Sequence, residues 1–211
     1  MKRIFCFGDS NTWGYISGTD HLRYGTDKRW TRLLQKNLDG KCEVIEEGLN
    51  SRTFFSVDNR PGREGRVGFD YLKPCLDTHD KIDFFVLMLG TNELKNSYNN
   101  TASEILAMFV KFVNVISQYK SQIDKSAVKL IVSGIPVVND ETEYAKEDGM
   151  YHGARIKSIE YNKLAKEYCL SNNITYLENV DLEVGIDGVH LTEQSHKMLA
   201  ERLAKAIEEQ L

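Results

Sequence analysis

The chain alternates between short, continuous apolar runs and longer amphipathic segments. Continuous rather than alternating hydrophobicity is typical of strands that are covered on both faces, as in a parallel sheet. The apolar runs predict strands over residues 4–7, 43–46, 84–89, 128–132 and 174–177.

The segments between these runs carry apolar residues at helical spacing. Within residues 155–170, Ile156 and Ile159 fall on the same side as Leu164 and Tyr168, and we expect that side to face the core. Thr192 stands where a helix N-cap is expected. This spacing predicts helices over residues 29–38, 101–119, 155–170 and 192–211.

Strands that alternate with helices predict right-handed crossovers and a three-layer α/β/α sandwich, here one domain over residues 1–211 with about five parallel strands. Three connections, 11–28, 49–68 and 136–153, are long for such a fold. Connections of this length are usually functional or interfacial. Because ligands of open α/β sheets bind at the carboxyl ends of the strands, we expect the chemistry of this chain there.

Composition narrows the possible functions. The formal net charge of −4 argues against a nucleic-acid-binding protein, which normally has a basic face. The 4 cysteines form no CxxC pair, which favours reduced cysteines over disulfides or a zinc site. No membrane span or signal peptide is recognisable, so we expect a cytoplasmic protein that acts without a membrane, a metal or a cofactor.

Small and polar residues follow the predicted strands and precede the last helix. They are GDS at 8–10, Gly48, GTN at 90–92 and DGVH at 187–190. Each group by itself is typical of a turn, because Gly, Asp, Ser and Asn are common turn residues. Together they supply the groups that a serine hydrolase needs.

A serine hydroxyl is a weak nucleophile and needs a base within hydrogen-bond reach. His190 is the candidate base for Ser10, and Asp187, three residues earlier, can orient it. Acyl transfer also needs donors for the tetrahedral oxyanion, and the backbone N–H groups of Ser10 and Gly48 with the side-chain amide of Asn92 are candidates. Asp9, next to the nucleophile, is expected to brace the turn by local hydrogen bonds.

These four blocks, in this order and spacing, resemble those of the SGNH (GDSL) hydrolases over essentially the whole chain. The tracts GDSNTWG, VIEEGLNSRT, YLKPCLDTH and MLGTNELK are most similar to the arylesterase and acyltransferase branch. The resemblance implies a flavodoxin-like fold, Ser10 as nucleophile, His190 and Asp187 as its triad partners, and Gly48 and Asn92 in the oxyanion hole. Two positions depart from the family pattern, Asn11 in place of Leu and Glu93 in place of Asp.

Three further expectations concern the surroundings of this site. Trp13 is a candidate wall of the acyl pocket, with ordinary packing as the alternative, and Asn11 is a candidate for shaping it. The remaining histidines, 21, 79, 152 and 196, lack metal-ligand spacing and are expected to be structural or on the surface. The arm of residues 49–68 carries Phe54, Phe55 and the cluster Arg60, Arg63 and Arg66. The resemblance implies that this arm mediates homo-oligomer formation, with a disordered basic loop as the alternative.

The expected function is hydrolysis of small carboxylic esters through an acyl-enzyme, with acyl transfer to alcohols as a related activity. Removal of acetyl groups from carbohydrates is the alternative within the same enzyme class. A non-catalytic, flavodoxin-like binding module is the alternative from another class, but no glycine-rich phosphate loop follows any predicted strand.

Overall fold

All strands of the central sheet run parallel, in the order β2-β1-β3-β4-β5, in the computed structural model, which describes residues 1–211. This is the flavodoxin-like strand order. The sequence prediction of a five-stranded parallel sheet is confirmed. The strands are β1 (Lys2–Gly8), β2 (Cys42–Gly48), β3 (Phe84–Met88), β4 (Lys129–Ser133) and β5 (Thr175–Leu177).

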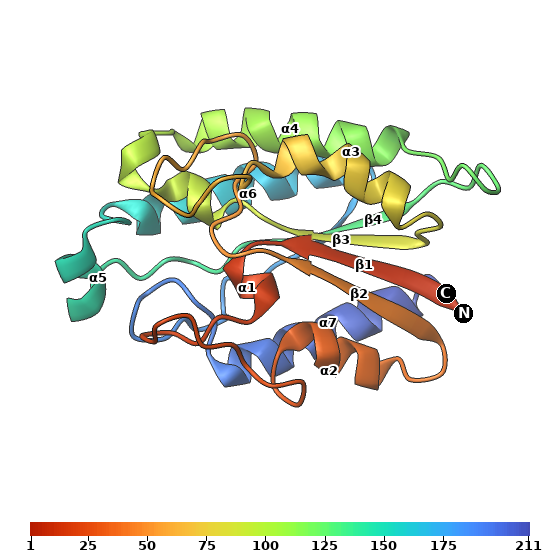
Figure 1. Cartoon of the computed structure of the whole chain (residues 1–211), viewed down its shortest axis with the longest axis horizontal. Coiled ribbons are helices and arrows are strands. Elements are labelled where there is room, and N and C mark those ends of the chain that lie inside the picture. The colour runs from red at the N-terminus through yellow and green to blue at the C-terminus, as the bar shows by residue number, and fades with distance from the viewer.

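Helices cover both faces of the sheet and complete the predicted three-layer sandwich (Figure 1). One layer holds α3 (Gly68–Thr78), α4 (Ala102–Gln118) and α6 (Ala154–Ser171). The other holds α2 (Trp30–Asn37) and α7 (Glu193–Glu208). Shorter helices, α1 (Ser10–Trp13) and α5 (Glu143–Asp148), and the 3-10 turns η1 (Thr91–Leu94) and η2 (Asn96–Tyr98) lie in the connections.

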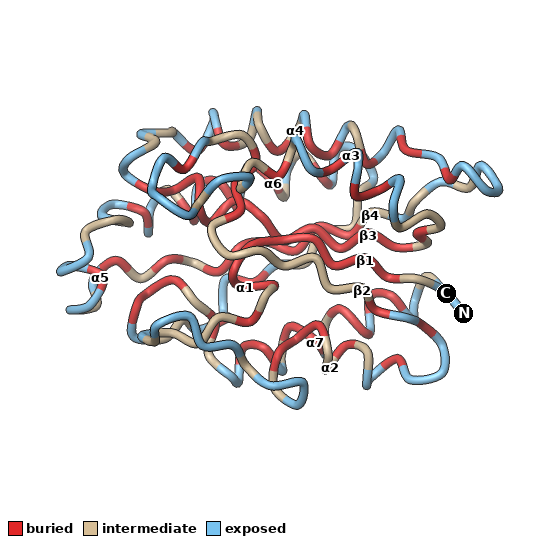
Figure 2. Tube along the Cα trace, viewed as in Figure 1, coloured by how far each residue is buried: buried red, intermediate tan, exposed pale blue.

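The two faces of the sheet carry separate hydrophobic cores, and the central strands β1 and β3 are mostly buried, whereas the edge strand β2 is largely intermediate (Figure 2). Phe5 and Phe85 pair in register and face the α3–α4–α6 layer. Their neighbours Ile4 and Phe84 also pair, but face the α2–α7 layer. Successive side chains of a strand point to opposite faces of the sheet, and here both faces are covered by helices. Neighbouring residues must therefore both be apolar, which explains the continuous apolar runs.

The buried face of α6 differs from the predicted one. Ile156 and Ile159 are 75% and 47% exposed, whereas the polar residues Ser158 and Asn162 are buried. The Ser158 hydroxyl accepts a hydrogen bond from the Val138 backbone at 3.2 Å. Asn162 exchanges two bonds with the Ile135 backbone, at 3.0 and 2.8 Å. These polar side chains provide hydrogen-bond partners for the buried backbone of the connection that follows β4. This face of α6 is therefore buried although it is less apolar than the face with Ile156 and Ile159.

Two of the long helices, α4 and α7, begin at a threonine N-cap. Thr192 caps α7 as predicted, because its side chain accepts a hydrogen bond from the Ser195 backbone. Thr101 and Glu104 form a reciprocal capping box at the start of α4. Helix α3 was not predicted, and it contains Pro74. None of the helices combines the length and apolar character needed to cross a membrane.

Candidate active site

The turn after β1 presents Ser10 at the start of α1. Asp9 is the N-cap residue, and its carboxylate accepts a hydrogen bond from the Asn11 backbone at 2.9 Å, which confirms its predicted bracing role. Gly8 packs closely against the end of β3, since a Cβ at this position would lie 2.4 Å from the Met88 carbonyl oxygen. Glycine therefore lets β1 run up to the sheet edge and turn there.

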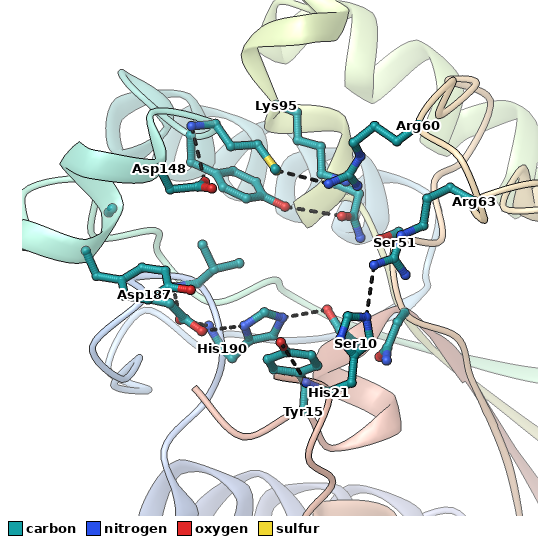
Figure 3. A pocket seen from close by; sticks show the side chains of 17 residues that line it. Ser10, Tyr15, His21, Ser51, Arg60, Arg63, Lys95, Asp148, Asp187 and His190 are labelled. Carbon is teal, nitrogen blue, oxygen red and sulfur yellow. Dashed lines mark hydrogen bonds and ion pairs between the residues drawn. The ribbon is translucent and has the colours of Figure 1, made fainter. Parts of the chain in front are cut away.

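Ser10, His190 and Asp187 form one hydrogen-bonded chain, shown in Figure 3. The Ser10 Oγ lies 2.9 Å from His190 Nε2, and His190 Nδ1 lies 2.7 Å from Asp187 Oδ2. With its proton on Nδ1, the imidazole donates to the carboxylate and accepts from the serine hydroxyl. Residues separated by 180 positions are thus brought into the geometry in which a histidine can remove a serine proton.

The loop that carries His190 is held by Asp187. Asp187 Oδ1 accepts hydrogen bonds from the backbones of Val189 and His190, both at 3.0 Å, across a turn in which Gly188 has a φ of +73°. Burial opposes ionisation of Asp187, but the hydrogen bonds and charge of His190 outweigh it and hold the pKa of this carboxyl below its usual range. The Tyr15 ring stacks on His190 with a centroid separation of 4.3 Å. Both contacts fix the orientation of the imidazole.

The candidate oxyanion donors lie around the same strand ends. Asn92, in η1, lines the pocket, and its amide is fixed at both ends: Nδ2 donates to the Arg52 carbonyl at 3.0 Å and Oδ1 accepts from the Tyr151 hydroxyl at 3.2 Å. The second Nδ2 hydrogen remains for a ligand. Gly48 lies at the end of β2 against α1, where a Cβ would meet the Trp13 backbone nitrogen at 2.2 Å. The Ser10 N–H lies in the first turn of α1, where helical N–H groups lack intrahelical acceptors.

Asn11 and Trp13 do not line the pocket that contains Ser10. Asn11 is buried and bonds to the backbone of the His190 loop instead. Trp13 packs beside Tyr15, and the Arg23 guanidinium lies over its ring at 5.1 Å from the centroid. The prediction that Trp13 walls the acyl pocket therefore has no support in its position, and ordinary packing describes it better.

The pocket itself, about 170 Å³, draws on all three long connections. His21 reaches it from the first connection, Asn50 and Ser51 from the second, and Tyr144 and Tyr151 from the third. The length of these connections was the only sequence signal for these residues. Three of the lining residues are cationic, namely Arg60, Arg63 and Lys95. The sequence suggested the two arginines only as part of a contact between copies, and it did not indicate Lys95.

One group outside this pocket has metal-ligand chemistry. Donor atoms of Glu47, Cys75 and His79 lie within 4.8 Å of one another, although their sequence spacing did not indicate it. Burial raises the pKa of the Cys75 thiol to about 11. The Arg52 guanidinium, 3.7 Å from Glu47, already offsets the charge of that carboxylate. This local charge balance favours ion pairing over a cation site.

Comparison with known proteins shows the family and the fold of the chain. The family model of GDSL-like lipases and acylhydrolases matches residues 4–203. The structure of an aryl esterase from M. smegmatis is similar, with 29% identity, a TM-score of 0.90 and complete coverage of both chains. A carbohydrate acetylesterase from Sinorhizobium meliloti is similar at 28% identity, with a TM-score of 0.90 and complete coverage of both chains. No curated protein sequence matches the chain.

Proposed function

The chain belongs to the family of GDSL-like lipases and acylhydrolases, and on that premise we propose that it is a serine esterase that cleaves small carboxylic esters through an acyl-enzyme. The observation that carries the proposal is the hydrogen-bonded chain from Ser10 through His190 to Asp187. An aryl esterase and a carbohydrate acetylesterase among the similar structures support the same reaction class.

Acylation begins when the Ser10 Oγ attacks the ester carbonyl carbon and its proton passes to His190 Nε2, 2.9 Å away. The new C–O bond leaves the carbonyl oxygen negatively charged. Asp187 then faces an imidazolium and stabilises it without taking the proton. The bond to the alcohol oxygen breaks, and His190 returns the proton to this leaving group.

The oxyanion is held by the N–H groups of Ser10 and Gly48 and by the Asn92 amide. Asn92 suits this role because hydrogen bonds to Arg52 and Tyr151 fix its orientation before substrate arrives. In the second half-reaction, water activated by His190 attacks the acyl-Ser10 ester and releases the acid. An alcohol that takes the place of this water would make the same enzyme an acyltransferase.

Deacetylation of carbohydrates is a second candidate because of the similarity to the S. meliloti acetylesterase. Aryl acetates and acetylated oligosaccharides share the acyl group and differ only in the alcohol. Comparing kcat/KM for the two substrate types therefore separates the candidates directly.

The decisive test of the proposed function is Ser10→Ala. We expect this variant to lose p-nitrophenyl acetate turnover, and to lose labelling by a fluorophosphonate, while keeping the wild-type circular dichroism spectrum. Ser103→Ala, an exposed position on α4, is the matched control and should keep both. Turnover that persists in a folded Ser10→Ala protein would contradict the proposal, and absence of labelling in wild type would favour a non-catalytic binding module.

We also propose a cytoplasmic location. All four cysteines are unpaired and buried, a pattern typical of proteins from reducing compartments. Fractionation of the native cells, with detection by antibody, tests this assignment. Recovery of the protein outside the cell would contradict it.

Self-association through the arm of residues 49–68 is a further proposal. Phe54 is buried and Phe55 stacks on Phe69, so both rings pack within their own chain. The exposed side chain of Val57 remains as an apolar contact for a second copy. Size-exclusion chromatography with light scattering measures the molar mass in solution. A single 24.2 kDa species at micromolar concentration would exclude self-association.

A further inference from the structure

A cationic wall, formed by Arg60, Arg63 and Lys95, lines the pocket that contains Ser10. The mechanism of ester cleavage uses none of these side chains. Figure 3 shows Arg63 and Lys95 on the side of the pocket across from His190 and Asp187. Positive charge is thus concentrated at this pocket, although the chain as a whole has a formal net charge of −4.

Lys95 is the most buried member of the wall, with 4% of its side chain exposed. Its one carboxylate partner is Asp58, at 3.5 Å. Asp58 is already engaged by the Arg60 guanidinium through two shorter bonds, at 2.8 and 2.5 Å. An ammonium group has three donors, so Lys95 retains hydrogen-bonding capacity that the chain does not use.

Lys95 is a charged donor at neutral pH. Burial, and then the positive charge of Arg60, lower the pKa of Lys95 to about 8. The group is therefore mainly protonated at neutral pH although it is desolvated. A buried ammonium with one long contact is stabilised by any anion that enters the pocket.

Arg63 has no carboxylate partner. One of its guanidinium nitrogens lies 3.0 Å from His21 Nε2. His21 Nδ1 lies 2.9 Å from Asp20, so the ring donates there and accepts from Arg63. The other guanidinium N–H groups are available, and their planar arrangement suits the two oxygens of a carboxylate or phosphate.

Asp58 offsets one of the three positive charges of the wall through its contacts with Arg60 and Lys95, which leaves an excess of positive charge on this side of the pocket. Asp148 also lines the pocket, but it is the last residue of α5, and Figure 3 places it away from Arg63. Its carboxylate accepts a hydrogen bond from the Met150 backbone at 3.3 Å. Asp187 is engaged by His190.

We propose that this pocket selects esters that also carry an anionic group, a carboxylate or a phosphate monoester, which binds to Lys95 and Arg63 while the ester carbonyl lies at Ser10. The inference rests on the proposed esterase function and names its substrate class. Charge-assisted hydrogen bonds of this kind give discrimination of about tenfold or more between an anionic ester and a neutral one.

The test compares three acetates of similar size: 4-acetoxybenzoate, 4-acetoxyphenyl phosphate and the neutral methyl 4-acetoxybenzoate. Each kcat/KM is divided by the rate constant for uncatalysed hydrolysis, which removes differences in leaving-group reactivity. We expect this normalised value to be at least tenfold higher for one or both anions at low salt, and to approach the neutral value in 1 M NaCl. The anion that is preferred identifies carboxylate or phosphate as the group recognised.

Two variants connect the preference to the wall. Arg63→Gln and Lys95→Met should each reduce the anion preference about tenfold. Arg63 is only half-buried, so its variant serves as the test if Lys95→Met fails to fold. Lys205→Gln, an exposed position on α7, removes the same charge far from the pocket and should leave the preference unchanged.

Equal normalised values for anionic and neutral esters in wild type would overturn the inference, and so would a preference that survives both variants. Failure of the proposed esterase function would give a different experimental result. In that case none of the three acetates is hydrolysed faster than by Ser10→Ala, whatever its charge.

Discussion

The side chain of Asn11, the residue after Ser10, accepts a hydrogen bond from the backbone of Leu191, the residue after His190, at 2.9 Å. The same amide donates to the Val189 carbonyl at 3.2 Å. One buried side chain thus joins the turn that carries the proposed nucleophile to the loop that carries the proposed base. The departure from the family pattern at Asn11 therefore bears on catalytic geometry rather than on the acyl pocket.

Asn11→Leu should weaken both the fold and catalysis. It leaves the Leu191 N–H and the Val189 carbonyl without this partner, which costs about 1–3 kcal/mol of unfolding free energy per buried unsatisfied group. We expect a lower kcat on p-nitrophenyl acetate with a smaller change in KM, since the Ser10–His190 distance is what the contact maintains. Urea denaturation and steady-state kinetics measure the two effects. A variant that matches wild type in kcat would show that the contact does not position His190.

Asn92→Ala should reduce kcat by about 10²–10³ if its amide stabilises the oxyanion. Tyr151→Phe removes one of the two hydrogen bonds that orient Asn92 and should give a smaller reduction in kcat. The two variants together separate the donor from the residue that positions it. Equal reductions of kcat in the two variants, or an unchanged kcat in Asn92→Ala, would contradict the role of Asn92 as an oxyanion donor.

Gly48→Ala should disrupt the site through the backbone. The added Cβ would lie 2.2 Å from the Trp13 nitrogen and 2.6 Å from the Thr12 carbonyl carbon, so α1 must move away from β2. We expect a large loss of activity together with a lower melting temperature. Gly40→Ala is a useful comparison because nothing lies within 4 Å of its Cβ, although its φ of +72° strains the substitution. Wild-type activity in Gly48→Ala would contradict the close packing.

His196 should make the protein less stable in acid. It is buried beneath α2, its Nδ1 accepts from the Trp30 backbone at 3.3 Å, and burial, aided by the charge of His190, lowers its pKa to about 3. An unfolded histidine titrates near 6.5, so between about pH 6.5 and 3 the unfolded state binds one more proton than the folded state. The contribution of His196 to the free energy of unfolding therefore falls with decreasing pH, by up to about 1.4 kcal/mol per pH unit.

The matching experiment compares urea denaturation of wild type and His196→Gln across this pH range. The difference in unfolding free energy between the two proteins should narrow or reverse as the pH falls, since the glutamine does not titrate. A difference that is constant from pH 7 to pH 4 would show that His196 is not held neutral by the fold.

The sequence by itself determined the sheet and the position of the catalytic candidates. The central strands β1 and β3 are buried on both faces, so their inner positions must be apolar and are visible as continuous runs in the chain. The carboxyl ends of parallel strands share one edge, so strand order along the chain is enough to predict that Ser10 and Asn92 lie together. The short spacing between Asp187 and His190 likewise predicts a contact, because a single turn joins them.

The tertiary structure alone decided which side of α6 is buried and what surrounds Ser10. Ser158 and Asn162 turn inward because the backbone after β4 needs hydrogen-bond partners, a requirement that the periodicity of α6 does not contain. The cationic wall combines residues from the second long connection with Lys95, which follows η1, and their charges act together only once these segments fold over one pocket. Pairings between residues far apart in the chain depend on packing, whereas local patterns report apolar positions, caps and turns within one segment.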